Sequence, residues 1–425
     1  MANNTIQVFE YEKLKLSDET ISDTNLKTLQ NHYGDKGIPY YTLIHNGIRF
    51  NNYVGVIQVN DLTIEILPKI DKIEKVTKDE WRTHLIKLLH YTGEIDVDAT
   101  EFSNLKTNKL TLLELYFAMF VKECDYLLHR GLVKKYRKEE GNLYTLKGGL
   151  QFGKNISQNL VHAERFYTKH IVYDKQHLLH QILMECMYLI QKISSSGNIH
   201  SSINKLLLNF PEQNRIKISD NTFAKIVINR KTEPYTKAIN IAKMILLNYH
   251  PDINIGSNSV LALFFDMNLL WEKYVAKVLR THLPIEYTIG TQNKRLFWAS
   301  DVVPDANIKP DILILKNGKV ERILDTKWKL PYDKRPSDED LKQMFSYNLI
   351  FNATESWLLY PNDKSYLNEG AFVDKHGNCG MLLITVLNKG ELNHYKLYIE
   401  IATLLRLLPI SEEKVLAGVI LEISN

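Results

Sequence analysis

The chain has 425 residues, 44% of them hydrophobic and 24% charged, which is ordinary for a globular protein with enough length for two or three domains. The 53 Lys and Arg nearly balance the 49 Asp and Glu, so net charge alone does not predict nucleic-acid binding and any basic face must be local. Three cysteines without a C-x-x-C pair argue against a zinc site. The start "MANNTIQVFEYEKLK" lacks signal-peptide order, and charges interrupt the most apolar helical stretch, so we expect a cytoplasmic protein.

Residues 1–75 have the pattern of a β-rich module. In "YVGVIQVNDLTIEILPKI", two β-rich runs flank Asn60-Asp61, a pair typical of a tight turn. Thr63 and Glu65 alternate with apolar residues, so the second run is expected to bury one face and expose the other. Such a module is either a plain structural domain or a barrel that binds DNA or a partner.

Residues 76–255 have a mainly helical pattern. "DEWRTHLIKLLHYTG" and "LLHQILMECMYLIQKI" repeat apolar residues at helical spacing. Cys124 and Cys186 lie in such apolar patterns and are expected to be buried thiols. The region therefore predicts a helical scaffold.

The segment "HRGLVKKYRKEEGNLYTLKGGLQFGKNI" of this region mixes basic and aromatic residues. Gly148-Gly149 marks a turn or a close approach of two backbones. Basic side chains interleaved with aromatic rings can bind phosphates and stack on bases, although the composition fits a solvated charged loop equally well. The residues expected to bind nucleic acid are Arg130, Lys134, Lys135, Arg137, Lys147 and Lys154.

Residues 256–425 alternate between helix and strand patterns. "LALFFDMNLLWEKYVAKVLRTHL" predicts one helix, and strands are predicted at 285–289, 295–299, 311–315 and 320–325, before a helix at 338–352 and two or three more strands. This order indicates a mixed α/β domain. The fold class we predict is a multidomain α+β or mixed α/β protein with a β module (1–75), a helical region (76–255) and a C-terminal domain (256–425).

The stretch "PDILILKNGKVERILDTKWK" combines a hairpin pattern with charged ends. Asp311 opens the first apolar run, Gly318 lies in the turn, and Asp325 and Lys327 end the return strand. Antiparallel pairing would bring Asp311 next to Asp325. The two-residue period of a strand would put Asp325 and Lys327 on one face.

Two adjacent carboxylates repel each other unless a cation lies between them, and Mg²⁺, with Mn²⁺ as a substitute, prefers oxygen ligands of this kind. Such an ion lowers the pKa of a bound water and stabilises charge on a phosphate oxygen. A neighbouring lysine can position or deprotonate that water, or stabilise the developing charge. These are the requirements of phosphodiester hydrolysis, so the pattern predicts a metal-dependent nuclease.

Short D/E-x-K matches arise easily by chance, and the chain has two more, at Asp340–Lys342 and Glu412–Lys414. The first lies in a predicted helix, where a two-residue step does not share a face, and the second lies in a turn. Only the match at 325–327 follows a strand and has Pro-Asp one hairpin upstream. The alternative is a surface hairpin whose end charges form an ordinary ion pair.

Two helical segments carry further polar candidates. Glu272, in "LLWEKYV", is flanked by core-type residues and could be an additional metal ligand or support one, or else an exposed residue beside Lys273. "DLKQMFSYNLI" places Asp340, Gln343 and Tyr347 on one helical face. That face could orient the attacking water or contact the scissile phosphate, or it could simply be exposed.

The motifs "KPDILIL" and "RILDTKWK", followed by "DLKQMFSY", resemble the PD-(D/E)xK nuclease superfamily, and in particular the McrC family of nuclease subunits in McrBC modification-dependent restriction systems. "LKGGLQFGKNI" resembles the Gly-rich segment of that family, except that Gly149 stands where Arg is common. The resemblance extends over most of the chain. It implies a restriction-endonuclease-like domain with a central mixed sheet flanked by helices.

The resemblance also implies roles for the site residues. Asp311 and Asp325 would bind the metal, Lys327 would be the catalytic lysine, and Gln343 and Tyr347 would support them. Family membership implies a partner, a hexameric AAA+ GTPase of the McrB type, on which the β module and helical region would dock. The chain would stimulate its GTP hydrolysis and cut double-stranded DNA, and two nuclease subunits could pair to cut both strands.

The sequence contains no G-x-x-x-x-G-K-[ST] motif, which fits a subunit that binds no nucleotide itself. Two other functions stay open, namely a non-cleaving regulator that activates the motor GTPase and a stand-alone repair nuclease. The intact acidic pair and lysine favour the nuclease subunit over the regulator. The long N-terminal regions, which resemble the McrC family throughout, count against a stand-alone nuclease.

Overall fold

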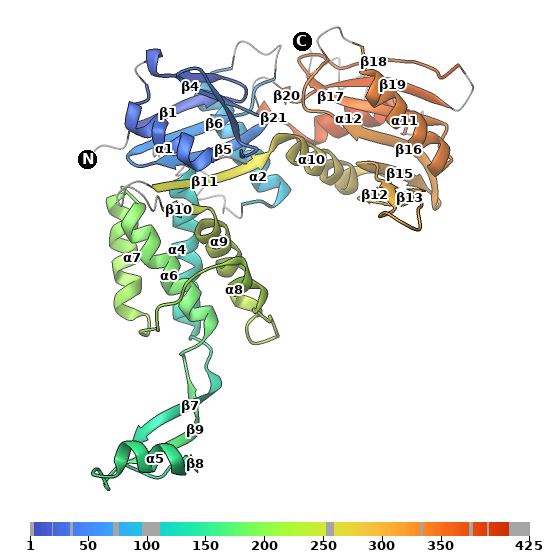
Figure 1. Cartoon of the computed structure of the whole chain (residues 1–425). Helices are drawn as coiled ribbons and strands as arrows, with labels where there is room; N and C mark the ends of the chain where they lie inside the picture. Colours follow the sequence, from blue (N-terminus) through green and yellow to red (C-terminus); the bar gives the residue numbers. More distant parts are fainter. Residues whose placement is uncertain are drawn as a thin grey trace. The chain divides into compact units, whose positions relative to one another are not determined.

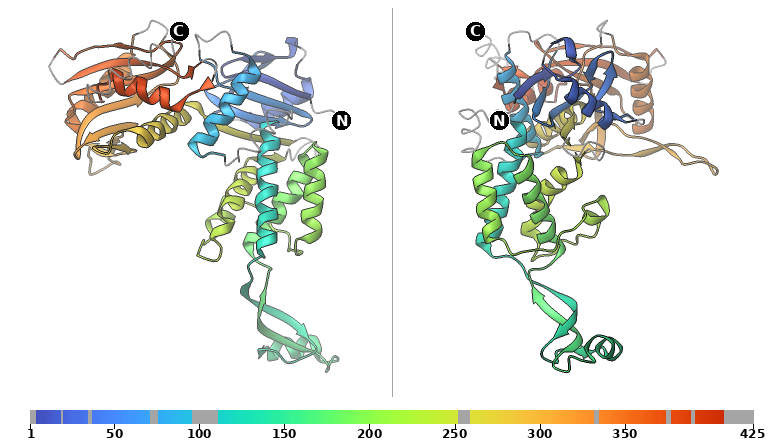
Figure 2. Two further views of the ribbon diagram at one scale, coloured as in Figure 1. Left: turned by 180° about the vertical axis from the view of Figure 1, so that it is seen from behind. Right: turned by 60° about the vertical axis from the view of Figure 1, so that its left-hand side comes forward.

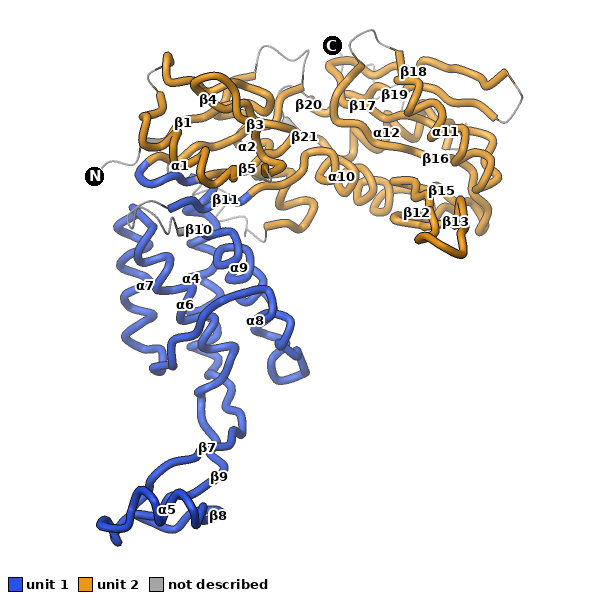
Figure 3. The backbone as a smooth tube through the Cα atoms, viewed as in Figure 1, with its two compact units in different colours: residues 1–4, 58–61, 110–263 blue, residues 5–57, 62–109, 264–425 orange. Residues whose placement is uncertain are grey.

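The computed structural model describes residues 4–18, 20–34, 37–70, 76–95, 111–251, 259–331, 335–373, 377–388 and 391–407. Figure 3 shows its two compact units, which we call unit 1 (residues 1–4, 58–61 and 110–263) and unit 2 (residues 5–57, 62–109 and 264–425). The helix at 78–92, predicted as part of the helical region, thus groups with the β module and the C-terminal domain. In the described residues, no helix combines the length and apolarity needed to cross a membrane.

Unit 2 begins with a small β module. Strands β1, β6, β5 and β11 lie in that order in one sheet, in which residues 58–59 of β5 and 259–263 of β11 are grouped with unit 1, and β2, β4 and β3 form a second sheet. The strands are β1 (Asn4–Phe9), β2 (Lys13–Lys15), β3 (Tyr41–Ile44), β4 (Gly47–Phe50), β5 (Tyr53–Val59), β6 (Leu62–Leu67) and β11 (Ser259–Asp266). Helices α1 (Asp23–Tyr33) and α2 (Lys78–Thr92) accompany them, and a short 3-10 helix spans Leu16–Asp18.

The turn between β5 and β6 is confirmed, because Asn60 adopts a left-handed φ of 55°. The prediction of one wet face on β6 is wrong. Thr63 and Glu65 are 1% and 2% exposed, since α2 packs on β6 and Arg82 of that helix donates to both carboxylate oxygens of Glu65. An ion pair therefore replaces water on this face of the strand.

Unit 1 is mainly helical, and Figures 1 and 2 show its longer helices packed beside one another. Cys124 and Cys186 are fully buried in two of them, as predicted. The helices are α4 (Leu112–Arg130), α6 (Leu178–Ile193), α7 (Gly197–Asn209), α8 (Asp220–Ala224) and α9 (Thr236–Leu247), and a 3-10 turn spans Glu233–Tyr235. Strand β10 (Tyr249–Pro251) pairs with the first residues of β11.

The basic and aromatic segment of unit 1 is an antiparallel ribbon, not a loop. Strand β7 (Lys135–Leu143) pairs along its length with β9 (Phe166–Asp174), and β8 (Gly149–Leu150) and α5 (Phe152–Asn159) complete it. Gly148 has φ 75°, and a Cβ there would lie 2.4 Å from the Lys169 carbonyl oxygen, so the predicted close backbone approach is confirmed.

The C-terminal part of unit 2 is built on a mixed sheet in the order β12-β15-β16-β17-β19-β18, in which β16, β17 and β19 are parallel. Its strands are β12 (Tyr287–Thr291), β15 (Ile312–Lys316), β16 (Lys319–Thr326), β17 (Glu355–Asn362), β18 (Tyr366–Asn368) and β19 (Asn378–Thr385). Two ribbons lie outside it, β13 (Arg295–Trp298) with β14 (Ala306–Ile308) and β20 (Leu387–Asn388) with β21 (Glu391–Leu392).

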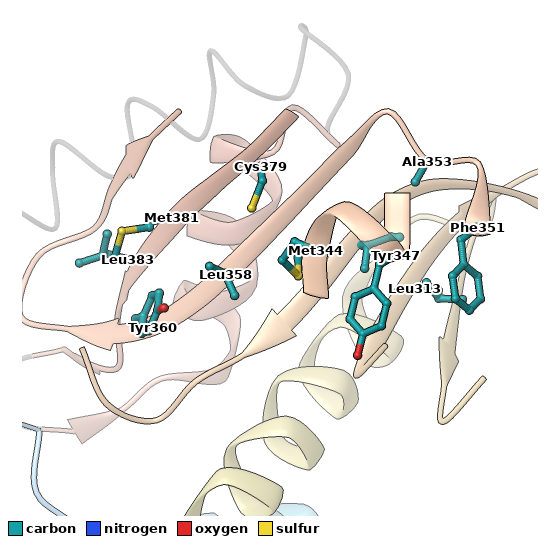
Figure 4. Packing of buried hydrophobic residues seen from close by; sticks show 11 residues of the cluster. Leu313, Met344, Tyr347, Phe351, Ala353, Leu358, Tyr360, Cys379, Met381 and Leu383 are labelled. Atoms are coloured by element: carbon teal, nitrogen blue, oxygen red, sulfur yellow. The ribbon is translucent and has the colours of Figure 1, made fainter. Parts of the chain in front are cut away.

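Helix α11 (Asp338–Phe351) covers the sheet through a buried cluster shown in Figure 4, in which Met344 and Tyr347 of the helix meet Ile323 and Leu358 of the strands. Helix α10 (Met267–His282) packs on α12 (His394–Leu404), which contacts β19. The single helix predicted from "LALFFDMNLLWEKYV" is wrong in its first part. Residues up to Asp266 are strand β11, and the Asp266 side chain caps α10 by accepting from Asn268 N–H.

Breaking the buried pair on β6 tests whether α2 depends on it. We expect Arg82→Ala to lower the free energy of unfolding by about 3 kcal/mol, because it removes the guanidinium that pairs with the buried Glu65 carboxylate. Urea titration measures the change. The control is Lys27→Ala, which breaks an exposed pair with Asp23 and should cost less than about 1 kcal/mol. Equal losses for the two variants would contradict a special role for the buried pair.

Candidate active site at the end of the β15–β16 hairpin

The hairpin of β15 and β16 turns at Asn317-Gly318, whose φ values of 49° and 80° suit these two residue types. Ile312 lies opposite Leu324 in the antiparallel register, so the start of one strand meets the end of the other. Thr326 donates its backbone N–H and its hydroxyl to Asp311 Oδ2, at 2.8 and 2.9 Å. The structure thus brings Asp311 beside the end of β16, where Asp325 lies.

Asp325 is a buried carboxylate, 3% exposed, at the end of β16. It shares its face of the strand with Ile323, which belongs to the cluster under α11. Its Oδ2 accepts no hydrogen bond of regular geometry and lies 2.8 Å from Lys327 Nζ. Burial, and then the nearby charge of Asp311, raise the pKa of Asp325 to about 6. The site therefore holds excess negative charge that one lysine only partly offsets.

Lys327 follows β16 directly, and its backbone N–H donates to the Leu359 carbonyl at 2.9 Å. Its ammonium lies 2.8 Å from Asp325 and 3.1 Å from Asp340, which starts α11. Burial lowers the pKa of Lys327, but the charge and hydrogen bonds of the two carboxylates outweigh burial, so the pKa is raised. Lys327 is therefore a protonated donor in this arrangement.

Helix α11 supplies two more of the predicted residues. Exposed Gln343 donates its side-chain amide to the Tyr347 hydroxyl at 2.9 Å, and that hydroxyl donates to the Lys309 carbonyl at 3.0 Å. Burial raises the pKa of Tyr347, so its hydroxyl keeps its proton. Because Lys309 precedes Pro310 and Asp311, this pair holds the chain that carries the first carboxylate.

Glu272 lies on α10, 8% exposed, and is not the solvated helical residue of the alternative interpretation. Burial, and then the charge of Asp311, raise its pKa. Gln292, at the end of β12, donates to Glu272 Oε1 at 2.8 Å and accepts a hydrogen bond from Lys309 Nζ. Glu272 thus feels the charge of the acidic pair and is tied to the same segment by Gln292.

Gln292, Lys309 and Thr326 belong to this network but were not predicted. Lys309 could have been noticed, because it directly precedes the Pro-Asp motif. No sequence signal distinguishes Gln292 or Thr326 from ordinary polar residues at strand ends. Asp340, expected only on a polar helical face, is a second carboxylate partner of Lys327.

The residues predicted to bind nucleic acid lie apart in sequence from the hairpin, at the end of α4 and in the β7–β9 ribbon. Arg137 pairs with Asp174 at 2.8 Å and with Glu139 at 3.2 Å, and Lys154 pairs with Glu140. These acidic partners offset positive charge that phosphates would need. The others are placed as follows: Arg130 contacts Tyr126, Lys134 lies over Tyr173, Lys135 faces Asp174 across the ribbon, and Lys147 is exposed.

Because the pKa of Asp325 is raised, we expect the stability of the folded chain to depend on pH through this carboxylate. We expect Asp325→Asn to raise the melting temperature in EDTA at pH 8, because it removes a buried charge that Asp311 repels. The folded wild type binds a proton at about pH 6, above the usual value of 3.8, so it gains stability as the pH falls through 6. The advantage of the variant should therefore shrink between pH 6 and pH 4.

Thermal unfolding at a series of pH values measures this difference. Asp338→Asn is the control, since Asp338 is exposed and pairs at the surface with Arg335, and it should show no such pH trend. If the melting temperature of Asp325→Asn were not higher than that of the wild type at pH 8, or exceeded it equally at all pH values, Asp325 would not be a buried carboxylate that Asp311 repels.

The comparisons with known proteins agree with this fold. Residues 48–361 match the family model of the McrBC 5-methylcytosine restriction system component. A chain of the Thermococcus gammatolerans assembly of McrB AAA+ hexamers with bound McrC has a TM-score of 0.68 and 18% identity, over 93% of this chain and 99% of that one. A chain of the Thermococcus gammatolerans McrBC complex gives 0.50 and 19%, over 65% and 87%.

No curated protein sequence matches the chain. The structural matches are under 25% identical and show a shared fold, the mixed α+β architecture predicted from the sequence. The family match covers well over half of the chain. The chain therefore belongs to the family of McrBC 5-methylcytosine restriction system components.

Proposed function

We propose that this chain is the DNA-cutting subunit of an McrBC-type restriction complex, a metal-dependent endonuclease of the PD-(D/E)xK type. The observation that carries the proposal is the convergence of Asp311, Asp325 and Lys327 at one end of the β15–β16 hairpin. An ordinary surface ion pair has no reason to be buried beside a second carboxylate, because each buried charge is costly.

The residues present fit a divalent cation. Asp311 lies close enough to Asp325 to raise the cost of ionising Asp325, and both bonds from Thr326 go to Asp311 Oδ2, which leaves Oδ1 for another ligand. In the part of the chain that the structure describes, no three His, Cys, Asp or Glu groups converge to hold a metal. That fits Mg²⁺, or Mn²⁺ in its place, which binds one or two carboxylates together with waters and substrate phosphates.

When bound, the ion would lower the pKa of a water and stabilise charge on the scissile phosphate. Asp311 and Asp325 would hold it, and Glu272 would add negative charge from α10. Lys327, kept protonated by Asp325 and Asp340, would donate to a phosphate oxygen on which charge develops, rather than remove a proton. Tyr347 would position the Asp311 segment, while exposed Gln343 would contact substrate.

The partner we propose is a hexameric AAA+ GTPase of the McrB type in the cytoplasm. The structure that this chain matches over 93% of its length holds McrC bound to McrB AAA+ hexamers.

In the β7–β9 ribbon, large apolar side chains are exposed, and such surfaces typically contact proteins. They include Tyr136, Tyr144, Leu146, Phe152, Ile156, Leu160, Val161, Ile171 and Tyr173. Docking would stimulate GTP hydrolysis and bring double-stranded DNA to the site, where two subunits could pair.

The proposal is tested by plasmid cleavage with the chain, its AAA+ partner, GTP and Mg²⁺, on methylated and unmethylated DNA. We expect cutting that requires all components. Asp325→Ala and Lys327→Ala should each lower its rate by about 100-fold or more, because the metal and the ammonium supply most of the charge stabilisation. Both variants should still stimulate GTP hydrolysis, because docking does not involve the hairpin.

The matched control is Lys342→Ala, which removes an exposed lysine from a second D-x-K match on α11. It should cut at the wild-type rate. Cutting by Asp325→Ala at the wild-type rate would refute the assigned site. Stimulated GTP hydrolysis without cutting by the wild type would instead favour the alternative function, a non-cleaving regulator that activates the motor.

A further inference from the structure

Lys327 is the first residue beyond β16, so the residues that follow it lie outside the regular backbone hydrogen bonds of the strand. Its own N–H reaches the Leu359 carbonyl of the neighbouring strand, which holds one side of the residue. The other side depends on Trp328. This residue is 4% exposed and lies in a bend that leaves the sheet. Whatever holds Trp328 therefore also limits where the Lys327 backbone can lie.

Trp328 is held by a residue from the other end of the chain. Its indole N–H donates to Glu10 Oε1 at 2.6 Å, across 318 positions of sequence. Glu10 directly follows β1 of the β module and is itself 4% exposed. The same Oε1 accepts the backbone N–H of Lys69 at 3.1 Å, so the carboxylate is fixed within the module. A buried N–H to a carboxylate is one of the stronger hydrogen bonds in a protein.

The neighbouring contacts repeat this connection between the β module and the hairpin. Lys329 Nζ lies 3.4 Å from the centroid of the Tyr11 ring, next to Glu10. On the second side, the Trp328 backbone N–H donates to Asn268 Oδ1 at 3.3 Å, and its ring contacts Trp271 edge-on at 5.7 Å. Both of these residues lie on α10, the helix that carries Glu272.

The β module also holds the start of α10. Asn52 accepts the backbone N–H of Met267 on its carbonyl at 2.9 Å, and its side-chain amide donates to Asp266 Oδ1 at 3.0 Å. Asp266 is the residue that caps α10. One module thus contacts two elements of the site, the segment after the lysine and the helix with the third carboxylate. All of these residues belong to unit 2.

We propose that Trp328 is a positioning residue for the catalytic lysine, and that the β module, through Glu10, is a working part of the nuclease site rather than a separate binding module. The inference rests on the proposed function. Without the anchor, Lys327 would be held by its own N–H, by the remaining contacts of Trp328 with α10, and by Asp325 and Asp340, of which Asp325 would also bind the metal ion. A displaced ammonium would slow the chemical step but leave DNA binding and motor docking intact.

Trp328→Phe tests this inference in the full chain with its AAA+ partner, because phenylalanine keeps most of the ring packing and loses the N–H donor. We expect kcat for DNA cleavage to fall by about 10- to 100-fold, the usual cost of misplacing a catalytic group. The KM for DNA and the stimulation of GTP hydrolysis should stay at wild-type values.

The matched control is Trp357→Phe. Trp357 is 5% exposed on β17 of the same sheet, and its indole N–H has no hydrogen-bond partner among the described residues. It loses the same volume and no hydrogen bond, so cleavage should be unchanged. Equal loss in the two variants, or a fall in GTPase stimulation together with cleavage by Trp328→Phe, would show a merely structural role and overturn the proposal.

A second measurement decides the inference without cleavage. Acetic anhydride labelling followed by mass spectrometry reports the exposure of the Lys327 amine, and we expect Trp328→Phe to raise its labelling while Trp357→Phe does not. Unchanged labelling in Trp328→Phe overturns the inference. A wild-type chain that never cuts DNA refutes the proposed nuclease function instead, and the labelling still tells whether Trp328 positions Lys327.

Discussion

The acidic hairpin depends on one constraint, its antiparallel register, which starts at the Asn317-Gly318 turn and shifts by one residue at an irregularity between Ile314 and Leu315. That register sets Ile312 opposite Leu324, so Asp311 meets Thr326 and Asp325 lies within range of its charge. A shift of one residue would turn Asp325 to the other face of the sheet and separate the carboxylates. The register therefore sets the cost of burying Asp325 beside a second carboxylate, and the chemistry of the site follows from how that cost is offset.

Lys327 and Asp340 show how the cost is partly offset in the folded chain. The ammonium sits between Asp325 and Asp340 at 2.8 and 3.1 Å, while Asp311 relies on the N–H and hydroxyl of Thr326. One ammonium thus contacts two carboxylates, while the charge of a third, Asp311, also acts on Asp325. The remaining negative charge is what a divalent cation would neutralise, and the same excess explains why the pKa of Asp325 is raised rather than lowered.

Local patterns predicted the parts of this site that are close in sequence. The hairpin, its Asn-Gly turn, the shared face of Asp325 and Lys327, and α11 with Gln343 and Tyr347 all follow from short-range periodicity. The burial of Glu65 could not be predicted, because strand alternation does not show which helix will pack on the polar face. The same limit applies to Gln292, whose contact with Glu272 depends on tertiary packing.

The length of an apolar run also did not distinguish a buried strand from a helix. The sequence pattern predicts residues 261–265 as part of the helix of "LALFFDMNLLWEKYV", because an apolar run of this length suits either a buried strand or a helix. Asp266, the capping residue, was the signal that separated β11 from α10. In β7 the sequence KYRKEEGNL is mostly charged and polar and has no alternation of apolar and polar residues, so the strand was not recognised; both of its faces remain at least partly exposed.

The contact between Glu10 and Trp328 changes how the domains should be understood. Sequence patterns separate a β module from a C-terminal α/β domain, and nothing in either stretch indicates that they share a compact unit. In the structure, a buried carboxylate of the first satisfies a buried indole of the second, one residue beyond the lysine of the acidic site. This hydrogen bond satisfies the buried indole N–H with a carboxylate, so it stabilises the contact between the two regions. The geometry of the lysine is therefore set by a contact across 318 residues, which no local motif encodes.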